Sequence, residues 1–345
     1  MKRQGIELYR FIMTLMVCLH HFRLYSETTL PFGGGYLAVD FFFILSGYFL
    51  YHHSIKKENS HSTNALQETA EYAIGRYKRL FPQYLLALLL SVAVYVCVLR
   101  VDMNITQISV WVAKILMFDG IYVHKQIDIM PQGWYCSVLL IDSILIYFLC
   151  VRFGQKFAKK AALMLAVGIY VILFLRYGFL NLYTQFGLGI TVGGFRGAAG
   201  LCMGCVLGSM GVGKREHGRK TGWIDAVVFL VSTGIIIYAL LWNMAYNKSD
   251  FVILGFFLVI LYYLLGDNNI SRLFDRYKLS GLGNISYNMY LIHYAVAVLF
   301  DHFNWFRSFD WKIASLAYLG VVIICSLLFE KIISVIKSGI YNGKK

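Results

Sequence analysis

The sequence predicts an all-α protein that crosses a lipid bilayer about ten times, and three observations support this prediction. Hydrophobic residues make up 59% of the 345 residues and charged residues only 14%, whereas a soluble domain has about 25% charged residues. The apolar residues form continuous runs of about 20, the length that a helix needs to cross the hydrocarbon core. The chain has three prolines and 17% aromatic residues, which excludes disordered and collagen-like chains.

Ten apolar runs are the expected spans, because they are too long and continuous for the strands of a membrane barrel. The ten spans are residues 6–25, 36–53, 80–99, 134–151, 161–177, 196–212, 223–243, 251–266, 284–304 and 311–335. A further apolar stretch at 108–123 holds Lys114 and Asp119, so we expect it to be interfacial or re-entrant. We expect residues 1–345 to form a single membrane domain.

Lysine and arginine are unevenly distributed among the loops, and this bias sets the expected orientation. With the N-terminus in the cytoplasm, 23 of the 32 basic residues fall on the cytoplasmic side. An even number of spans then places the C-terminus in the cytoplasm as well. The net charge of +14 is thus explained by topology, and we expect no nucleic acid among the partners. The sequence does not specify an oligomeric state.

Ionisable side chains in the first span are functional candidates, because charged groups are costly inside a membrane. Arg10 and His21 are eleven residues apart, about three helical turns, so they share one face and lie about 16 Å apart along the axis. Glu7 is placed to pair with Arg10. His20 points to a different face, so at most one of the two histidines is expected to do chemistry. Arg10 by itself is also typical of an anchor at the membrane edge.

Other ionisable residues lie at span ends, and each has a structural interpretation beside the functional one. Asp40 begins the second span, where a carboxylate can cap a helix. Arg76 and Arg79 precede the third span, where basic residues also act as topology signals. Glu330 lies near the inner end of the last span, where it is also placed to pair with Lys331 or a neighbouring arginine. Together these residues fit a transporter or flippase of a glycan or small anion. They equally fit an enzyme that takes an anionic donor from the cytosol and passes a group outward.

Five short motifs occur in order along the chain. The first is RFIMTLMVCLHH at 10–21, an Arg followed eleven residues later by a His, and the second is GGYLAVDFFFILSGYFL at 34–50. The others are RYKRLFPQY at 76–84, GNISYNMYLIH at 283–293 and SLLFEK at 326–331. Each motif is weak alone, but five in this order in a ten-span chain resemble the membrane acyltransferase-3 family.

One departure from the family pattern concerns the acceptor. Members that modify surface polysaccharides often carry Trp-Ser-Leu-x-x-Glu-Glu-x-x-Tyr before the fourth span. Here GWYCSVLL at 133–140 keeps Trp134 and lacks the acidic pair. The identity of the acceptor is therefore left open by the sequence.

The resemblance implies an O-acyltransferase of the bacterial plasma membrane that moves an acyl group, usually acetyl from acetyl-CoA, to a hydroxyl of a cell-envelope glycan. Succinyl or another acyl group stays open. Arg76 and Arg79 are expected to bind the phosphates of CoA. His21 is expected to be the general base that takes the proton of the acceptor hydroxyl.

The remaining motif residues receive supporting roles from the same resemblance. Asp40 is expected to orient His21, and Arg10 or Ser46 to stabilise the tetrahedral oxyanion. Ser46 as a covalent nucleophile is the less favoured alternative, because no dedicated base is identifiable beside it. Glu330 is expected to orient a basic group or contact a substrate. Substrate-binding or structural motif roles are expected for Glu7, Ser46, Trp134, Ser286, Tyr287 and His293. No metal is expected.

Overall fold

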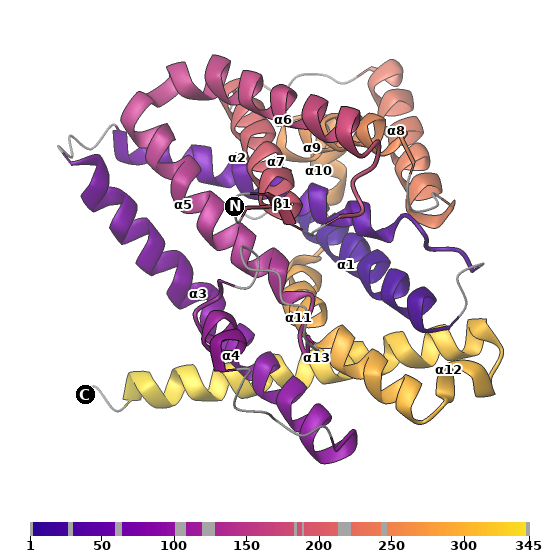
Figure 1. The fold of residues 1–345 in the computed structure, drawn as a ribbon. Coiled ribbons are helices and arrows are strands. Elements are labelled where there is room, and N and C mark those ends of the chain that lie inside the picture. The colour runs from indigo at the N-terminus through magenta and orange to yellow at the C-terminus, as the bar shows by residue number, and fades with distance from the viewer. Residues whose placement is uncertain are drawn as a thin grey trace.

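The computed structural model describes residues 3–26, 30–58, 64–100, 108–118, 128–182, 185–187, 190–212, 222–242 and 247–342. Within these ranges the chain is a bundle of long helices with one small antiparallel hairpin, formed by β1 (Gln185–Gly187) and β2 (Ile190–Thr191). The all-α expectation is therefore confirmed (Figure 1).

Each of the ten predicted spans coincides with a helix. These helices are α1 (Gln4–Tyr25), α2 (Ala38–Glu58), α3 (Ala65–Ala93), α5 (Gly133–Lys156), α6 (Ala162–Arg176), α7 (Val192–Ser209), α8 (Trp223–Trp242), α9 (Asp250–Leu265), α11 (Ser280–His302) and α13 (Trp311–Asn342). By length and hydropathy, five stretches of the described chain can cross a membrane: Ala65–Val98, Gly133–Arg176, Val192–Ser209, Trp223–Trp242 and Trp311–Val335. The protein is a multi-pass membrane protein, and both the count of ten and the cytoplasmic termini stay predictions.

The third helix is longer than the predicted span, and the difference matters for the site. Helix α3 begins at Ala65, where the side chain of Asn64 caps it by accepting hydrogen bonds from the main-chain N–H groups of Leu66 and Gln67. The helix continues through Pro82 and runs into a π-helical segment, Val94–Val98. The two arginines that precede the apolar run thus lie on a regular helix, which fixes the direction of their side chains.

The apolar stretch at 108–123 contains a short helix, α4 (Ile108–Ile115). Eight residues rise only about 12 Å, so α4 cannot cross the bilayer. Its Lys114 is buried and forms an ion pair of 2.7 Å with Asp128, which explains how a lysine is tolerated in this stretch. Asp119 lies outside the described residues. An interfacial or re-entrant segment therefore fits the structure.

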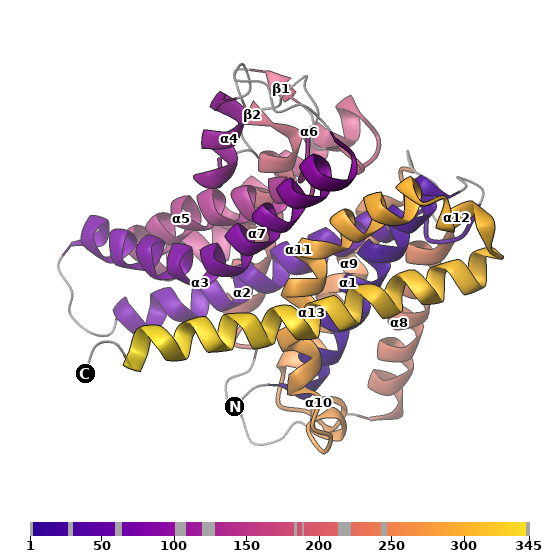
Figure 2. The same ribbon diagram turned by 90° about the horizontal axis from the view of Figure 1, so that it is seen from below.

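Four further short elements lie in the described part of the chain: the 3-10 helix Gly35–Leu37, the π-helical segment Phe157–Ala161 between α5 and α6, α10 (Asn269–Phe274) and α12 (Trp305–Ser308). Figure 2 shows α4, the hairpin and α12 in the upper half of the view, with the first turn of α1 and the last turns of α13 in the lower half. The first turn of α1 and the end of α13 therefore lie toward the same side of the bundle.

Helices α2 and α7 pack closely because glycine removes the side chain where their backbones meet. A Cβ atom at Gly204 would overlap the carbonyl oxygen of Ile44, and one at Gly47 would overlap that of Leu201. Gly200 and Gly208 extend the same stripe against Phe43 and Tyr51. These small residues therefore form a helix-packing surface between α2 and α7.

Candidate functional site

The N-terminal half of α1 carries an ion pair that faces α11. Arg10 Nη1 lies 3.1 Å from Glu7 Oε2, so the pairing expected from their spacing is confirmed. Glu7 is buried and Arg10 is about a third exposed. A Cβ atom at Gly283 of α11 would overlap Oε2 of Glu7, so only glycine lets α11 approach this carboxylate. The ion pair is thereby held at the α1–α11 interface.

A cavity of about 600 Å³ opens beside this ion pair, and we call it the central cavity. Its walls come from α1, α2, α3, α5, α11 and α13. Eight predicted site residues line it: Glu7, Arg10, Ser46, Arg76, Arg79, Ser286, Tyr287 and Glu330. The fold thus brings residues from the two ends of the sequence into one site. The other four candidates, His21, Asp40, Trp134 and His293, are not among its lining residues.

Three arginines contribute positive charge to the central cavity. Arg76 is buried and donates a hydrogen bond of 3.0 Å from Nη1 to the hydroxyl of Tyr72, while its Nε has no hydrogen-bond partner among the described residues. Arg79 lies one turn further along α3 and is exposed. Arg10 faces the same cavity from α1. A guanidinium with unused donors suits phosphate or carboxylate groups of a ligand.

The motif residues on α11 and α13 hold the cavity wall together. The side-chain amide of Asn288 donates a hydrogen bond of 2.9 Å to Glu330 Oε2. This carboxylate is therefore held by an amide on α11. The Ser286 hydroxyl donates to the carbonyl of Leu282 at 2.7 Å. The Tyr287 hydroxyl donates to the carbonyl of Leu80 at 3.2 Å, which ties α11 to α3.

His21 lies further along α1, against His293 of α11. Their ring centroids are 4.7 Å apart at an interplanar angle of 62°. His21 Nδ1 lies 3.0 Å from the carbonyl oxygen of Val17, and His293 Nδ1 lies 2.6 Å from that of Tyr290. A carbonyl oxygen can only accept, so both Nδ1 atoms carry a proton, and in the neutral form of each ring the lone pair is on Nε2.

Tyr290 connects the histidine pair to the central cavity. Its side chain lines the cavity, and its main-chain carbonyl holds His293. Its hydroxyl donates to the carbonyl of Gln132 at 2.9 Å, which fixes the ring in place. His293 therefore lies about one helical turn beyond Tyr290, and His21 about two turns beyond Thr14, the last residue of α1 that lines the cavity. His20 points elsewhere, with its Nδ1 3.3 Å from the carbonyl of Phe32.

The expectation that Asp40 orients His21 is wrong, because its carboxylate is engaged elsewhere. Asp40 is fully buried and accepts two hydrogen bonds from Arg196 of α7, at 2.8 Å from Nε and 2.5 Å from Nη2. Arg196 Nη2 also donates to the carbonyl of Tyr36 at 2.8 Å. A buried carboxylate needs a full counter-charge, and the guanidinium supplies it in bidentate form.

The sequence analysis did not single out Arg196, and it left the role of Trp134 open. Arg196 is the first residue of a predicted span. Because an arginine inside a membrane needs a counter-charge, its position alone could have indicated an acidic partner such as Asp40. Trp134 was expected to have a substrate-binding or a structural motif role, and its ring packs against Gly193 and Phe43, as the structural role requires. Trp134 therefore helps to position α5 against α2 and α7.

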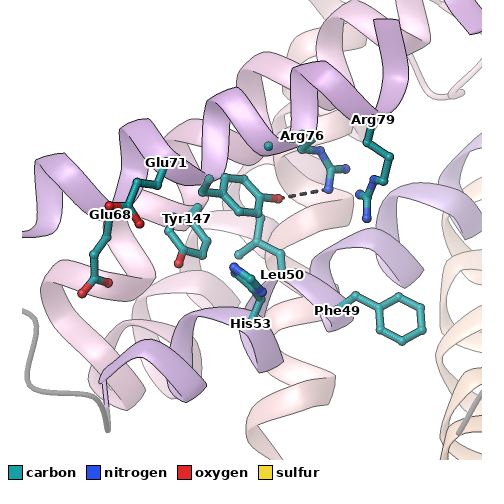
Figure 3. Close-up of a pocket in the computed structure, with 10 residues that line it drawn as sticks. Phe49, Leu50, His53, Glu68, Glu71, Arg76, Arg79 and Tyr147 are labelled. Carbon is teal, nitrogen blue, oxygen red and sulfur yellow. Dashed lines mark hydrogen bonds between the residues drawn. The ribbon is translucent and has the colours of Figure 1, made fainter. Parts of the chain in front are cut away.

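A second pocket of about 500 Å³ adjoins the central cavity, and it was not anticipated (Figure 3). We call it the tyrosine pocket, lined by Phe49, Leu50, His53, Glu68, Glu71, Tyr72, Gly75, Arg76, Arg79 and Tyr147. It shares Phe49, Arg76 and Arg79 with the central cavity. Glu68, Tyr72, Arg76 and Arg79 follow a helical spacing, which would have revealed this face had the helix been extended back to residue 65.

No group of three or more His, Cys, Asp or Glu side chains is placed to hold a metal ion in the described ranges.

A comparison with known protein families identifies the same family as the five sequence motifs. A family model described as an acyltransferase domain, of the acyltransferase-3 type, matches residues 3–331. No curated protein and no solved structure gives a significant match. The match covers almost the whole chain, including every residue of the central cavity and the histidine pair.

Proposed function

The chain belongs to the membrane acyltransferase-3 family, and from this premise we propose that it transfers an acyl group from cytosolic acyl-CoA to a hydroxyl of a cell-envelope glycan. The proposal places it in the bacterial plasma membrane and takes acetyl as the simplest acyl group. Membership of an acyltransferase family favours this reaction over the transporter that the sequence left open.

One observation carries the proposal: an arginine-lined cavity and a histidine pair lie along the same α1–α11 interface. Arg10, Arg76 and Arg79 line the cavity at the end that the basic residues predict to be cytoplasmic, where acyl-CoA is available. His21 lies about 16 Å further along α1, toward the opposite side. A donor held by its phosphates would thus direct its thioester toward His21, while an acceptor hydroxyl would arrive from outside.

The reaction follows from the state of the His21 ring. With Nδ1 donating to Val17, the lone pair on Nε2 can accept the proton of the acceptor hydroxyl. The acceptor oxygen attacks the thioester carbonyl carbon and forms a tetrahedral oxyanion. Collapse breaks the carbon–sulfur bond, and the departing CoA thiolate takes the proton back from the imidazolium. The products are an O-acyl ester and CoA, with His21 returned to its neutral form.

The oxyanion requires a donor, and the central cavity offers two candidates. Arg10 carries a partly exposed guanidinium, and Ser46 carries a hydroxyl. A donor aimed at developing charge commonly contributes about 3–4 kcal/mol to the barrier. Glu330, held by Asn288, lies in the same cavity and is proposed to orient the arginine groups or a polar part of the substrate.

The test is acyl transfer by the purified protein in lipid nanodiscs, with release of CoA thiol as the readout. Mass spectrometry of envelope glycans from cells with and without the gene identifies the acceptor. We expect an O-acyl group that is present only with the gene and only when His21 is intact. Identical glycans from both cells, together with no acceptor-dependent CoA release, would contradict the proposal.

A further inference from the structure

The tyrosine pocket has opposite charges at its two ends. Figure 3 shows Glu68 and Glu71 at one end and Arg76 and Arg79 at the other, with Tyr147 and His53 between them. The acidic and basic residues are eight positions apart on one helix, so about 12 Å of helix separates them. A ligand that fills this pocket must present hydrogen-bond donors at one end and negative charge at the other.

Three buried polar atoms of the pocket have no hydrogen-bond partner among the described residues. They are Oε2 of Glu68, Nε of Arg76 and the hydroxyl of Tyr147. These residues are only 5%, 8% and 0% exposed. A buried polar atom without a partner is costly, and here three such atoms gather in one pocket. Their positions indicate where a ligand would supply the missing hydrogen bonds.

An aromatic wall lies between the two charged ends. The rings of Tyr72 and Tyr147 are stacked with centroids 4.0 Å apart and an interplanar angle of 3°. The ring of His53 lies 5.7 Å from both. Flat aromatic surfaces of this kind bind the planar faces of nucleobases.

We propose that the tyrosine pocket binds the nucleotide end of acyl-CoA, an adenine with phosphates on its ribose; this inference rests on the function proposed above. The amino group of the base donates to Glu68, and the base packs against the aromatic wall. The phosphates bind Arg76 and Arg79. Because both arginines and Phe49 also line the central cavity, the pantetheine arm continues from the phosphates into that cavity.

The acidic end distinguishes a nucleotide from a simpler anion. A lipid phosphate or inorganic phosphate would bind the arginines and leave the buried oxygen of Glu68 without a partner. An adenine nucleotide satisfies both ends, because its amino group can donate to Glu68 while its phosphates bind Arg76 and Arg79.

Gly75 makes a clean test possible. Gly75 lines the pocket and a Cβ atom there meets no atom within 4 Å, so a side chain can begin at this position without a clash, and we expect Gly75→Leu to occupy part of the pocket. Leucine is also the better helix former, so the fold should not be weakened. Gly168 of α6 has equally open surroundings and lines neither pocket, so Gly168→Leu is the matched control.

The experiment measures binding of adenosine 3′,5′-bisphosphate and of acetyl-CoA to purified protein in nanodiscs. We expect Gly75→Leu to weaken both ligands at least tenfold and Gly168→Leu to leave both within twofold. The preference for acetyl-CoA over acetyl-pantetheine, which lacks the nucleotide, should fall at least tenfold in Gly75→Leu. Unchanged binding of both ligands in Gly75→Leu would overturn the pocket assignment.

Glu68→Gln tests the recognition of the base itself. The unaltered protein should prefer the adenine bisphosphate over its hypoxanthine analogue at least tenfold, because hypoxanthine carries an oxygen where adenine carries the amino group. Glu68→Gln should remove most of this preference, since an amide can donate to that oxygen. A purely structural role for Glu68 would weaken both analogues alike and would contradict the proposal.

Failure of the pocket and failure of the proposed function are separable. If acetyl-CoA is used normally but Gly75→Leu changes neither its KM nor bisphosphate binding, the pocket assignment falls and the acyl transfer stands. If acetyl-CoA is neither bound nor used, the proposed donor falls. Binding of adenosine 3′,5′-bisphosphate then still tests whether the tyrosine pocket binds a nucleotide, because this ligand carries no thioester and does not depend on acyl transfer.

Discussion

The imidazole rings of His21 and His293 lie against each other across the α1–α11 interface, with centroids 4.7 Å apart. Each ring donates from Nδ1 to a main-chain carbonyl of its own helix, so each presents a lone pair on Nε2. His293 is fully buried, and its Nε2 has no hydrogen-bond partner among the described residues. The pair therefore combines a base-competent atom on α1 with a rigid neighbour that fixes its ring.

His21→Ala should abolish acyl transfer while leaving the protein folded in the membrane. The expected loss is at least about 100- to 10,000-fold in kcat, the contribution usual for a general base. The matched control is His20→Ala, because His20 binds the carbonyl of Phe32 and faces Tyr36 rather than His293. His20→Ala should lower thermal stability and keep most of the activity. Activity within threefold of wild type for His21→Ala, at matched amounts of purified protein, would rule out this mechanism.

Arg76→Ala and Arg79→Ala should each raise the KM for acetyl-CoA with a smaller change in kcat. A lost charge-assisted hydrogen bond is worth roughly 1.5–3 kcal/mol, or about ten- to a hundredfold in affinity. Lys78 is exposed and lines neither pocket, so Lys78→Ala is the matched control and should leave the KM within twofold. Equal effects of all three substitutions would mean that only the net charge of this segment matters.

Asp40→Asn should act on stability rather than on the chemical step. Removing one partner of a buried ion pair leaves an unpaired charge on Arg196, at a cost of roughly 3–5 kcal/mol. The double variant Asp40→Leu with Arg196→Met removes both charges and should recover most of the folded protein. Its activity per folded molecule should approach that of wild type. A stable but inactive double variant would show that Asp40 takes part in the reaction after all.

Gly283→Ala should destabilise the α1–α11 interface, because the added methyl group would overlap the carboxylate of Glu7. The expected result is a lower melting temperature and a lower yield in the membrane. Shortening the opposing side chain in the double variant with Glu7→Ala should restore part of the stability, but it also removes the partner of Arg10. Additive losses in the double variant would show that the two residues are not coupled.

The orientation of the protein in the membrane can be checked with cysteines introduced one at a time into a variant in which the exposed Cys97 is changed to Ser. The distribution of basic residues predicts that a cysteine at position 57 is cytoplasmic and one at position 248 is outside. A membrane-impermeant thiol reagent added to intact cells should label position 248 and miss position 57. Labelling of position 57 from outside would reverse the predicted topology.

Much of the architecture follows from the sequence alone. A helix in a bilayer satisfies its own backbone hydrogen bonds, so each apolar run of sufficient length predicts a helix before any partner is known. Local spacing likewise predicted the Glu7–Arg10 pair, because neighbours three or four residues apart on a helix meet without help from tertiary contacts. The same helical spacing predicted that Arg10 and His21 lie on one face of the first helix.

Tertiary structure alone decided which distant residues meet. Asp40 and Arg196 are 156 positions apart, and no local rule could have paired this carboxylate with α7 rather than with His21. The His21–His293 contact and the tyrosine pocket likewise depend on how α11 packs on α1 and on how α5 packs on α3. Helix propensity and hydropathy are properties of one segment, whereas the partner of a buried charge is set by which helices share an interface. The electrostatics of the site therefore became visible only when the bundle was assembled.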